Sequence, residues 1–297
     1  GRLIRQIKLS TARSVTTSSD VNSIRDVTGW FEASWEGSFR ISGGSSEIQN
    51  DDSITEWYDY NTQKSAFDKP TLANATSSTQ PKYRSNGING IPSVYFDGTD
   101  DFIEFVVGAG DQPKFPVINK DRSFSMFAVF RTDASAAGGT NFITQLSGSP
   151  ASNALTNQTY AGLGIYGGKP SLMVNSGADK NYKINFALQD MTDYILGAVA
   201  DFPVGDLDQA TSAMVKMYLN SSTVAQQTTS NLESGNVNVG TSRFIIGSGN
   251  DTAARPFKGL ISEVIIFDRA LKKEEAQSVM KYLQKKYGIK DSSIAPD

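Results

Sequence analysis

The sequence predicts a mainly β protein, an antiparallel two-sheet jelly-roll sandwich, on three observations. Short alternating apolar runs recur along the chain and are separated by clusters of Gly, Asn, Asp and Pro. Residues 80–105, QPKYRSNGINGIPSVYFDGTDDFIEF, set turn pairs directly before an alternating strand that ends in carboxylates. Residues 243–271 repeat this order, with a strand, a polar loop and a second strand that runs into a helix.

The alternation predicts strands whose approximate limits follow. They are 92–97, 101–107, 123–132, 141–146, 160–167, 170–175, 183–188, 194–201, 212–220, 242–248 and 259–268. The run 123–132 carries Phe124, Met126 and Phe130 on one face and Phe127 and Val129 on the other. Because both faces are apolar, we expect this strand to lie between two layers of the protein.

Residues 272–287 read as a helix that caps the sandwich. The apolar residues at helical spacing are Ala276, Val279, Met280, Leu283 and Tyr287. Lysines crowd the last turn, and the glycine at position 288 is a typical helix stop. The predicted organisation is an N-terminal extension over 1–27, a sandwich over 28–288 and a polar tail over 289–297.

The N-terminal extension contains a small apolar patch, Leu3, Ile4 and Ile7, among basic residues. It resembles the membrane-distal continuation of a type IV pilin-like N-terminal helix, which implies a helical extension whose patch contacts another subunit. The alternative is a short segment that packs on its own sandwich. The apolar core of a signal peptide is not visible in it.

Composition excludes several classes of function. The chain has 28 basic and 31 acidic residues and a net charge of −3, which removes the electrostatic attraction that non-specific nucleic-acid binding needs. No apolar run approaches the ~20 residues of a membrane span. The absence of Cys and His excludes disulfides, thiolate nucleophiles and the usual general base. If the protein is exported, the absence of Cys favours a bacterial source.

The motifs resemble those of the bacterial laminin-G-like group of concanavalin A-like jelly rolls. The segments that carry the resemblance are 30–34 (WFEAS), 57–59 (WYD), 74–76 (NAT), 80–83 (QPKY), 86–92 (NGINGIP), 96–101 (FDGTDD), 215–220 (VKMYLN) and 257–271. Residue 32 is Glu where the group usually has Asp, and the Ser-Gly that usually follows the second motif is absent. The resemblance implies an exported protein at the cell surface or outside the cell, lectin-like in adhesion or glycan binding.

Such sandwiches often hold Ca²⁺ at one rim, where loop oxygens converge. Calcium takes about 6–8 oxygen ligands from carboxylates, amides and carbonyls. The candidates lie in two loops that the resemblance places close together: Asp97, Asp100, Asp101, Asn250 and Asp251. The alternative is that these residues only form turns, since Asp and Asn often bond their own backbone.

A glycan site needs an aromatic platform beside planar polar groups. Aromatic residues are concentrated in the first sixty positions, which include Trp30, Trp35 and Tyr60. The preferred candidates, because a polar loop follows them, are Trp57, Tyr58, Asp59 and Asn61. The alternative for each tryptophan is a place in the core.

Catalysis is not predicted, and no catalytic residue is assigned. The Glu-x-Asp-x-x-Glu arrangement of related glycoside hydrolases is absent. Asp100 and Glu104 share a predicted strand face at another spacing, and Glu263 and Asp268 lie on opposite faces. The sequence therefore favours a surface lectin that binds a glycan or another cell. The second hypothesis is a structural subunit of a pilus-like or other extracellular filament that displays the sandwich outside.

Overall fold

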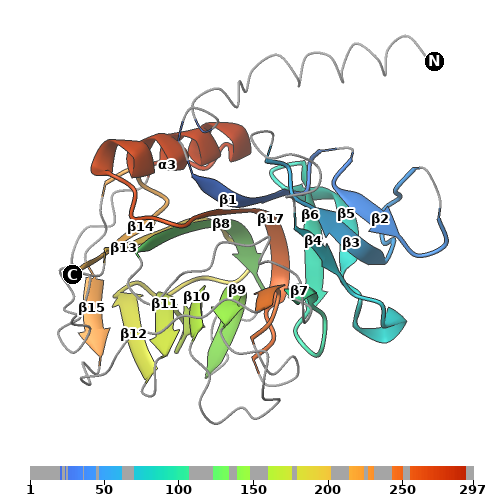
Figure 1. Cartoon of the computed structure of the whole chain (residues 1–297), viewed down its shortest axis with the longest axis horizontal. Helices are drawn as coiled ribbons and strands as arrows, with labels where there is room; N and C mark the ends of the chain where they lie inside the picture. Colours follow the sequence, from blue (N-terminus) through green and yellow to red (C-terminus); the bar gives the residue numbers. More distant parts are fainter. Residues whose placement is uncertain are drawn as a thin grey trace.

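The computed structural model is a sandwich of two antiparallel sheets with helix α3 at its C-terminal end (Figure 1). It describes residues 21, 24, 26–35, 37–44, 47–61, 70–106, 123–133, 139–147, 160–175, 179–201, 214–223, 227–230, 243–249 and 255–291. The predicted fold class is confirmed for the sheets and for α3. The predicted helical extension over residues 1–27 lies mostly outside the described residues, which include positions 21, 24, 26 and 27 of it, and Val27 already begins strand β1.

The seven-stranded sheet has the order β14-β13-β8-β17-β6-β5, with β1 paired to β17. Its strands are β1 Val27–Glu32, β5 Lys82–Ile88, β6 Ile91–Asp97, β8 Phe124–Thr132, β13 Asp193–Ala200, β14 Val215–Leu219 and β17 Lys258–Phe267. Strands β1 and β5 of this sheet lie ahead of the predicted strands, and the alternation did not single them out.

The ten-stranded sheet has the order β15-β12-β11-β10-β9-β16-β7-β4-β3-β2. Its strands are β2 Phe39–Ile41, β3 Ile54–Tyr58, β4 Thr71–Ala73, β7 Ile103–Val106, β9 Thr140–Ser147, β10 Tyr160–Tyr166, β11 Lys169–Asn175, β12 Asp179–Ile184, β15 Gln227–Ser230 and β16 Arg243–Ile246. A short 3-10 turn, η1 Ser77–Thr79, follows β4.

One predicted strand was displaced along the chain. The sequence placed it at 183–188, whereas β12 ends at Ile184. Phe186 and Leu188 then follow in an irregular segment, where the Leu188 N–H donates to the Gly168 carbonyl 3.0 Å away. Leu188 is still buried in the core, so its apolar character does not distinguish a strand position from a packed loop position.

The main core fills the space between the sheets, and β8 shows how the layers are built. Phe124, Met126 and Phe130 face this core, while Phe127 and Val129 face a second core. All five are completely buried. The prediction of a strand with two apolar faces is therefore confirmed, because β8 lies between the ten-stranded sheet and α3.

The second core lies under helix α3, Lys273–Tyr287, on the outer face of the seven-stranded sheet (Figure 1). The predicted stripe is buried, and Tyr282 joins it. Gly288 ends the helix with φ 63°, a left-handed conformation that favours glycine. Val21 and Ile24, which lie in the predicted extension, are also buried in this second core.

Candidate functional site

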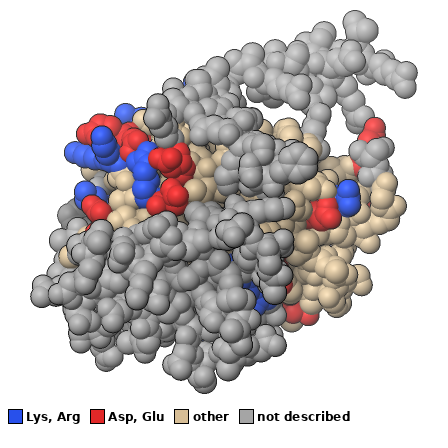
Figure 2. Space-filling model, viewed as in Figure 1, with Lys and Arg blue, Asp and Glu red and all other residues tan. Residues whose placement is uncertain are grey.

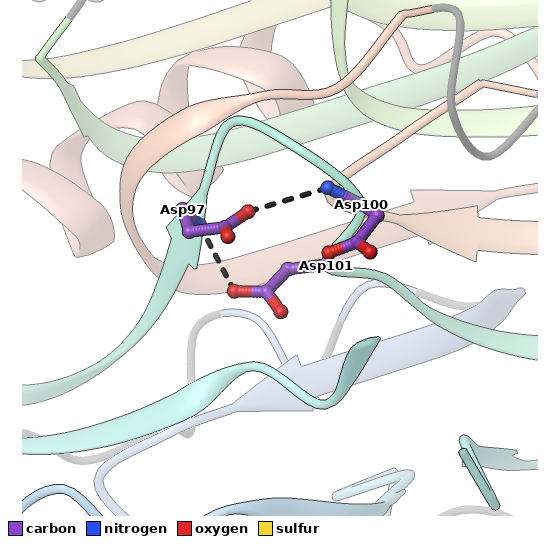
Figure 3. A group of neighbouring side chains, drawn as sticks. All are labelled: Asp97, Asp100 and Asp101. Atoms are coloured by element: carbon purple, nitrogen blue, oxygen red, sulfur yellow. Dashed lines mark hydrogen bonds between the residues drawn. The ribbon is translucent and has the colours of Figure 1, made fainter. Parts of the chain in front are cut away.

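Three aspartates gather in the turn that carries the chain from the seven-stranded to the ten-stranded sheet. The turn begins at Asp97, the last residue of β6, and ends shortly before β7. Asp97, Asp100 and Asp101 each present a carboxylate oxygen, and these oxygens all lie within 4.8 Å of one another. Figure 3 shows the three carboxylates around the same small space. Three of the five candidate ligands therefore lie together, while the metal role predicted for them stays a prediction.

The turn holds its own carboxylates through backbone hydrogen bonds. Asp97 Oδ1 accepts from the Thr99 N–H at 2.7 Å and from the Asp100 N–H at 3.3 Å. Asp101 Oδ2 accepts from the Asp97 N–H at 3.0 Å. Gly98 has φ 78°, a conformation that this tight return needs. These bonds also satisfy the turn-forming alternative, so convergence alone does not identify a metal site.

The electrostatics of the turn favour an added positive charge. Asp101 is buried, and burial raises the pKa of its carboxyl to about 6, with a further contribution from the negative charges of Asp97 and Asp100. Within the part of the chain that the structure describes, no ion pair reaches these three side chains. The turn therefore concentrates negative charge where water is partly excluded.

The second predicted loop starts and ends beside this turn. Lys258, the first residue of β17, is paired with Asp97, and Ile246, the last residue of β16, is paired with Ile103. The connection between β16 and β17 therefore leaves and re-enters the sheets next to the aspartates. Asn250 and Asp251 belong to this connection but lie outside the described residues, so their part in the site stays a prediction.

The preferred aromatic candidate packs inside the protein. Trp57 has no exposed surface and contacts Phe31 and Phe39 in the main core. Asp59 and Asn61 are each 1% exposed, and Asn61 donates to the Val27 carbonyl at 2.6 Å. A sugar platform requires an exposed ring, so this burial argues against a ligand role for Trp57 and gives it the alternative role in the core.

Asp59, which directly follows β3, links this segment to β1 of the other sheet. Its Oδ1 accepts from the Trp30 N–H at 3.0 Å and from the Asn61 N–H at 2.9 Å. Tyr58 is half-buried, and its hydroxyl donates to Glu56, which also pairs with Arg40 at 3.4 Å. Of the four predicted ligand residues, only Tyr58 keeps a substantial part of its side chain accessible.

The structure instead exposes Trp35, in the connection between β1 and β2. Its side chain is 36% exposed and meets the ring of Tyr60 edge-on, with ring centroids 5.4 Å apart. Tyr60 packs edge-on against the buried Trp30 at 5.0 Å, and Trp30 against Tyr282 of α3 at 6.0 Å. A continuous series of rings thus connects the surface to the second core.

Sequence reasoning missed a buried charged cluster under α3, which we call the clasp: Glu32, Glu263 and Lys286. Glu32 and Glu263 are direct partners on β1 and β17. Lys286 Nζ lies 2.6 Å from an oxygen of each carboxylate. Trp30 Nε1 and the Tyr287 hydroxyl also donate to Glu263, at 2.7 and 2.9 Å. The strand register brings the two glutamates together and the packing of α3 adds Lys286, so spacing along the chain gives no signal for the cluster.

The catalytic alternatives also have definite positions. Asp100 lies in the turn before β7, not on a strand face with Glu104, so that part of the prediction was wrong. Glu104 pairs with Arg243 across β7 and β16. Glu263 has no exposed side-chain surface, and within the clasp it pairs with Lys286.

The predicted assembly patch, Leu3, Ile4 and Ile7, lies outside the described residues. The filament hypothesis therefore stays a prediction. In the described part of the chain, no helix has the length and apolar character of a membrane span. Sedimentation velocity of the chain with and without residues 1–15 would test the patch, since the hypothesis expects assembly to disappear while a folded monomer remains.

Comparison with solved structures finds a similar fold in other proteins. A sialidase of Trypanosoma rangeli, in complex with 2,3-difluorosialic acid, aligns with a TM-score of 0.52 and 13% identity, over 86% of this chain and 33% of that one. The binding domain of Paraclostridial Mosquitocidal Protein 1 aligns with a TM-score of 0.52 and 11% identity, over 86% and 52%. The chain thus spans about a third of the sialidase and about half of the binding-domain chain.

Sequence comparison gives the family. No curated protein sequence matches the chain. The family model described as concanavalin A-like lectin/glucanases superfamily, of the laminin G type, matches residues 97–277. This match covers more than half of the 297 residues and includes the acidic turn, the paired strands β8 and β17 and the start of α3. The chain belongs to the concanavalin A-like lectin/glucanases superfamily.

Proposed function

We propose that this protein is a non-catalytic, lectin-like module that acts outside the cell and binds glycans, with Ca²⁺ held at the acidic turn. The observation that carries the proposal is the convergence of Asp97, Asp100 and Asp101 at the rim of a sandwich from a lectin and glucanase superfamily. The similarity of the chain to part of a sialidase adds support for a sugar ligand.

The donor set of the turn suits a hard cation. Carboxylate oxygens are preferred ligands of Ca²⁺, which tolerates irregular geometry and completes its shell with water or carbonyl oxygens. Three carboxylates supply part of the shell, and the adjacent loop containing Asn250 and Asp251 would supply further oxygens. Burial is the main cause of the raised pKa of Asp101, and a bound cation would offset both the cost of its buried charge and the repulsion from Asp97 and Asp100.

A non-catalytic role fits the state of the paired glutamates. Glycoside hydrolysis needs two carboxyl groups on either side of a bound sugar. Glu32 and Glu263 are close together, but Lys286 occupies the space between them and α3 covers them. Glu263 is completely buried and accepts three hydrogen bonds, so it offers no face to a substrate.

Thermal unfolding with and without CaCl2 tests the cation. A ligand that binds only the folded state stabilises it by about 2.7 kcal/mol at a hundredfold excess over Kd, so we expect Tm to rise by several degrees. Asp97→Ala and Asp100→Ala should each remove this rise. Glu274→Ala, which removes an exposed carboxylate from α3, should keep it.

Binding of the protein to a panel of immobilised glycans, in CaCl2 and in EDTA, tests the function itself. The proposal expects retention on at least one glycan and weaker retention in EDTA. A protein that gains no stability from calcium but still binds glycans would reduce the aspartates to turn formers. A protein that binds no glycan in either buffer would overturn the proposed function.

A further inference from the structure

Trp35 has the properties of a sugar-stacking residue. Sugar rings have an apolar C–H face that packs on aromatic rings, so a protein that binds them needs an indole or phenol that is exposed and held still. The chain contains three tryptophans. Trp30 and Trp57 have no exposed surface, whereas Trp35 is 36% exposed.

The indole of Trp35 is fixed from two sides. Its ring lies against Gly37 so closely that a Cβ at position 37 would be 2.8 Å from the Trp35 Cζ2 atom. On another side it meets Tyr60, whose N–H donates to the Trp30 carbonyl at 2.6 Å. The Ser38 N–H donates to the Trp35 carbonyl at 2.9 Å, and this backbone hydrogen bond holds the turn that carries the ring.

The clasp supports this arrangement from below. Trp30 packs against Tyr60, and its Nε1 donates to Glu263 at 2.7 Å. Glu263 is in turn bound by Lys286. A ring that is 36% exposed at the surface is thus supported by contacts that reach the second core. Such preorganisation lowers the entropy lost when a ligand binds.

The charges beside Trp35 indicate which sugars fit. Glu32 lies three residues before Trp35 and accepts a hydrogen bond from the Ser34 hydroxyl. Lys286 is buried and paired with two carboxylates, so its charge is already balanced. With two carboxylates for one ammonium, the clasp has no positive charge available to pair with a sugar carboxylate, so a neutral sugar is favoured.

We infer that Trp35, with Tyr60 at its edge, is a binding subsite for neutral hexopyranose units of a glycan. The inference rests on the proposed glycan-binding function and adds the position and the sugar class. It does not depend on calcium, because the acidic turn and Trp35 belong to different connections between the sheets.

Tryptophan fluorescence gives a specific measurement of this subsite. Because Trp35 is the exposed tryptophan of the three, acrylamide should quench its emission first. Lactose should protect it from quenching in a saturable way, and 3′-sialyllactose should protect it less at equal concentration. The same titrations by calorimetry give the affinities directly.

Three variants separate stacking from folding. Trp35→Ala should weaken lactose binding by about tenfold, and Trp35→Tyr should retain more of it. Gly37→Ala keeps the indole but displaces it, so it should weaken binding while leaving Tm close to the wild-type value. Tyr166→Ala, which removes another half-buried aromatic from β10, serves as the matched control and should bind normally.

The outcomes distinguish this inference from the function on which it rests. Glycan binding that persists unchanged in Trp35→Ala and Gly37→Ala would overturn the subsite and leave the proposed function intact. Stronger protection by 3′-sialyllactose than by lactose would overturn the sugar class. If neither lactose nor any glycan of the immobilised panel binds the wild type, the proposed function fails as well.

Discussion

The acidic turn and the clasp each place carboxylates close together, and they differ in how the negative charge is compensated. Both bring carboxylates together around one that is buried, Glu263 in the clasp and Asp101 in the turn. In the clasp, Lys286 lies between Glu32 and Glu263, and further donors complete the shell of Glu263. In the turn, Asp97 and Asp101 are held by backbone N–H groups, which contribute partial charges but no full positive charge. The clasp contains its own cation, whereas no described basic side chain forms an ion pair with the aspartates of the turn.

The difference follows from where each cluster lies. The clasp joins β1, β17 and α3, so a charge left unpaired there would have no access to water. Burial raises the pKa of Glu263, and the Lys286 ammonium opposes this shift. The turn lies at the end of the sheets, where solvent and ions reach it. Over the visible face of α3, by contrast, acidic and basic side chains stand side by side in water (Figure 2).

Removing the cation from the clasp should give the largest effect. Lys286→Met keeps the aliphatic stem but leaves two buried carboxylates that repel each other. Breaking a buried ion pair in this way costs about 3–5 kcal/mol, so we expect a large drop in the free energy of unfolding, measured with urea.

The matched control for this change is Lys285→Met, which removes the neighbouring but exposed lysine of the same helix. It should change stability by no more than about 0.5 kcal/mol. Equal effects of the two substitutions would show that the loss comes from removing a lysine from the helix, and that the buried ion pairs of the clasp add no stability of their own.

The same contrast explains which features the sequence could predict. The local signals of β8 and α3, two-sided apolar alternation and an apolar stripe with a glycine stop, were sufficient for the sandwich and its cap. The turn was predictable because its aspartates are neighbours in sequence. The clasp was not, since Glu32 and Glu263 are 231 positions apart and meet only through the register of β1 and β17.

The tryptophans show the limit of residue type as a signal. A tryptophan followed by a polar loop describes Trp57 and Trp35 equally well. Trp57 alternates into the main core, while Trp35 lies in a connection between sheets and rests on Gly37. Exposure therefore depends on the path of the chain between the sheets, which composition does not specify.

Removing one charge from the acidic turn should have a smaller effect of opposite sign. Asp101→Asn keeps an oxygen that can accept from the Asp97 N–H but removes the buried negative charge. Without added calcium at pH 7, we expect the variant to be more stable than the wild type by about 1–2 kcal/mol. Asp100→Asn, which changes a less buried member of the same turn, should stabilise less.

The pH dependence of this gain identifies its cause. Burial raises the pKa of Asp101 from an ordinary value of 3.8 to about 6, so the folded protein binds more protons than the unfolded chain between these values. Wild-type stability should therefore fall, relative to Asp101→Asn, as the pH rises from about 4 to 6. Urea unfolding at pH 4, 5, 6 and 7 measures the gap. A gap that stays constant with pH would mean that Asp101 acts through its hydrogen bond, and that its charge is already compensated within the turn.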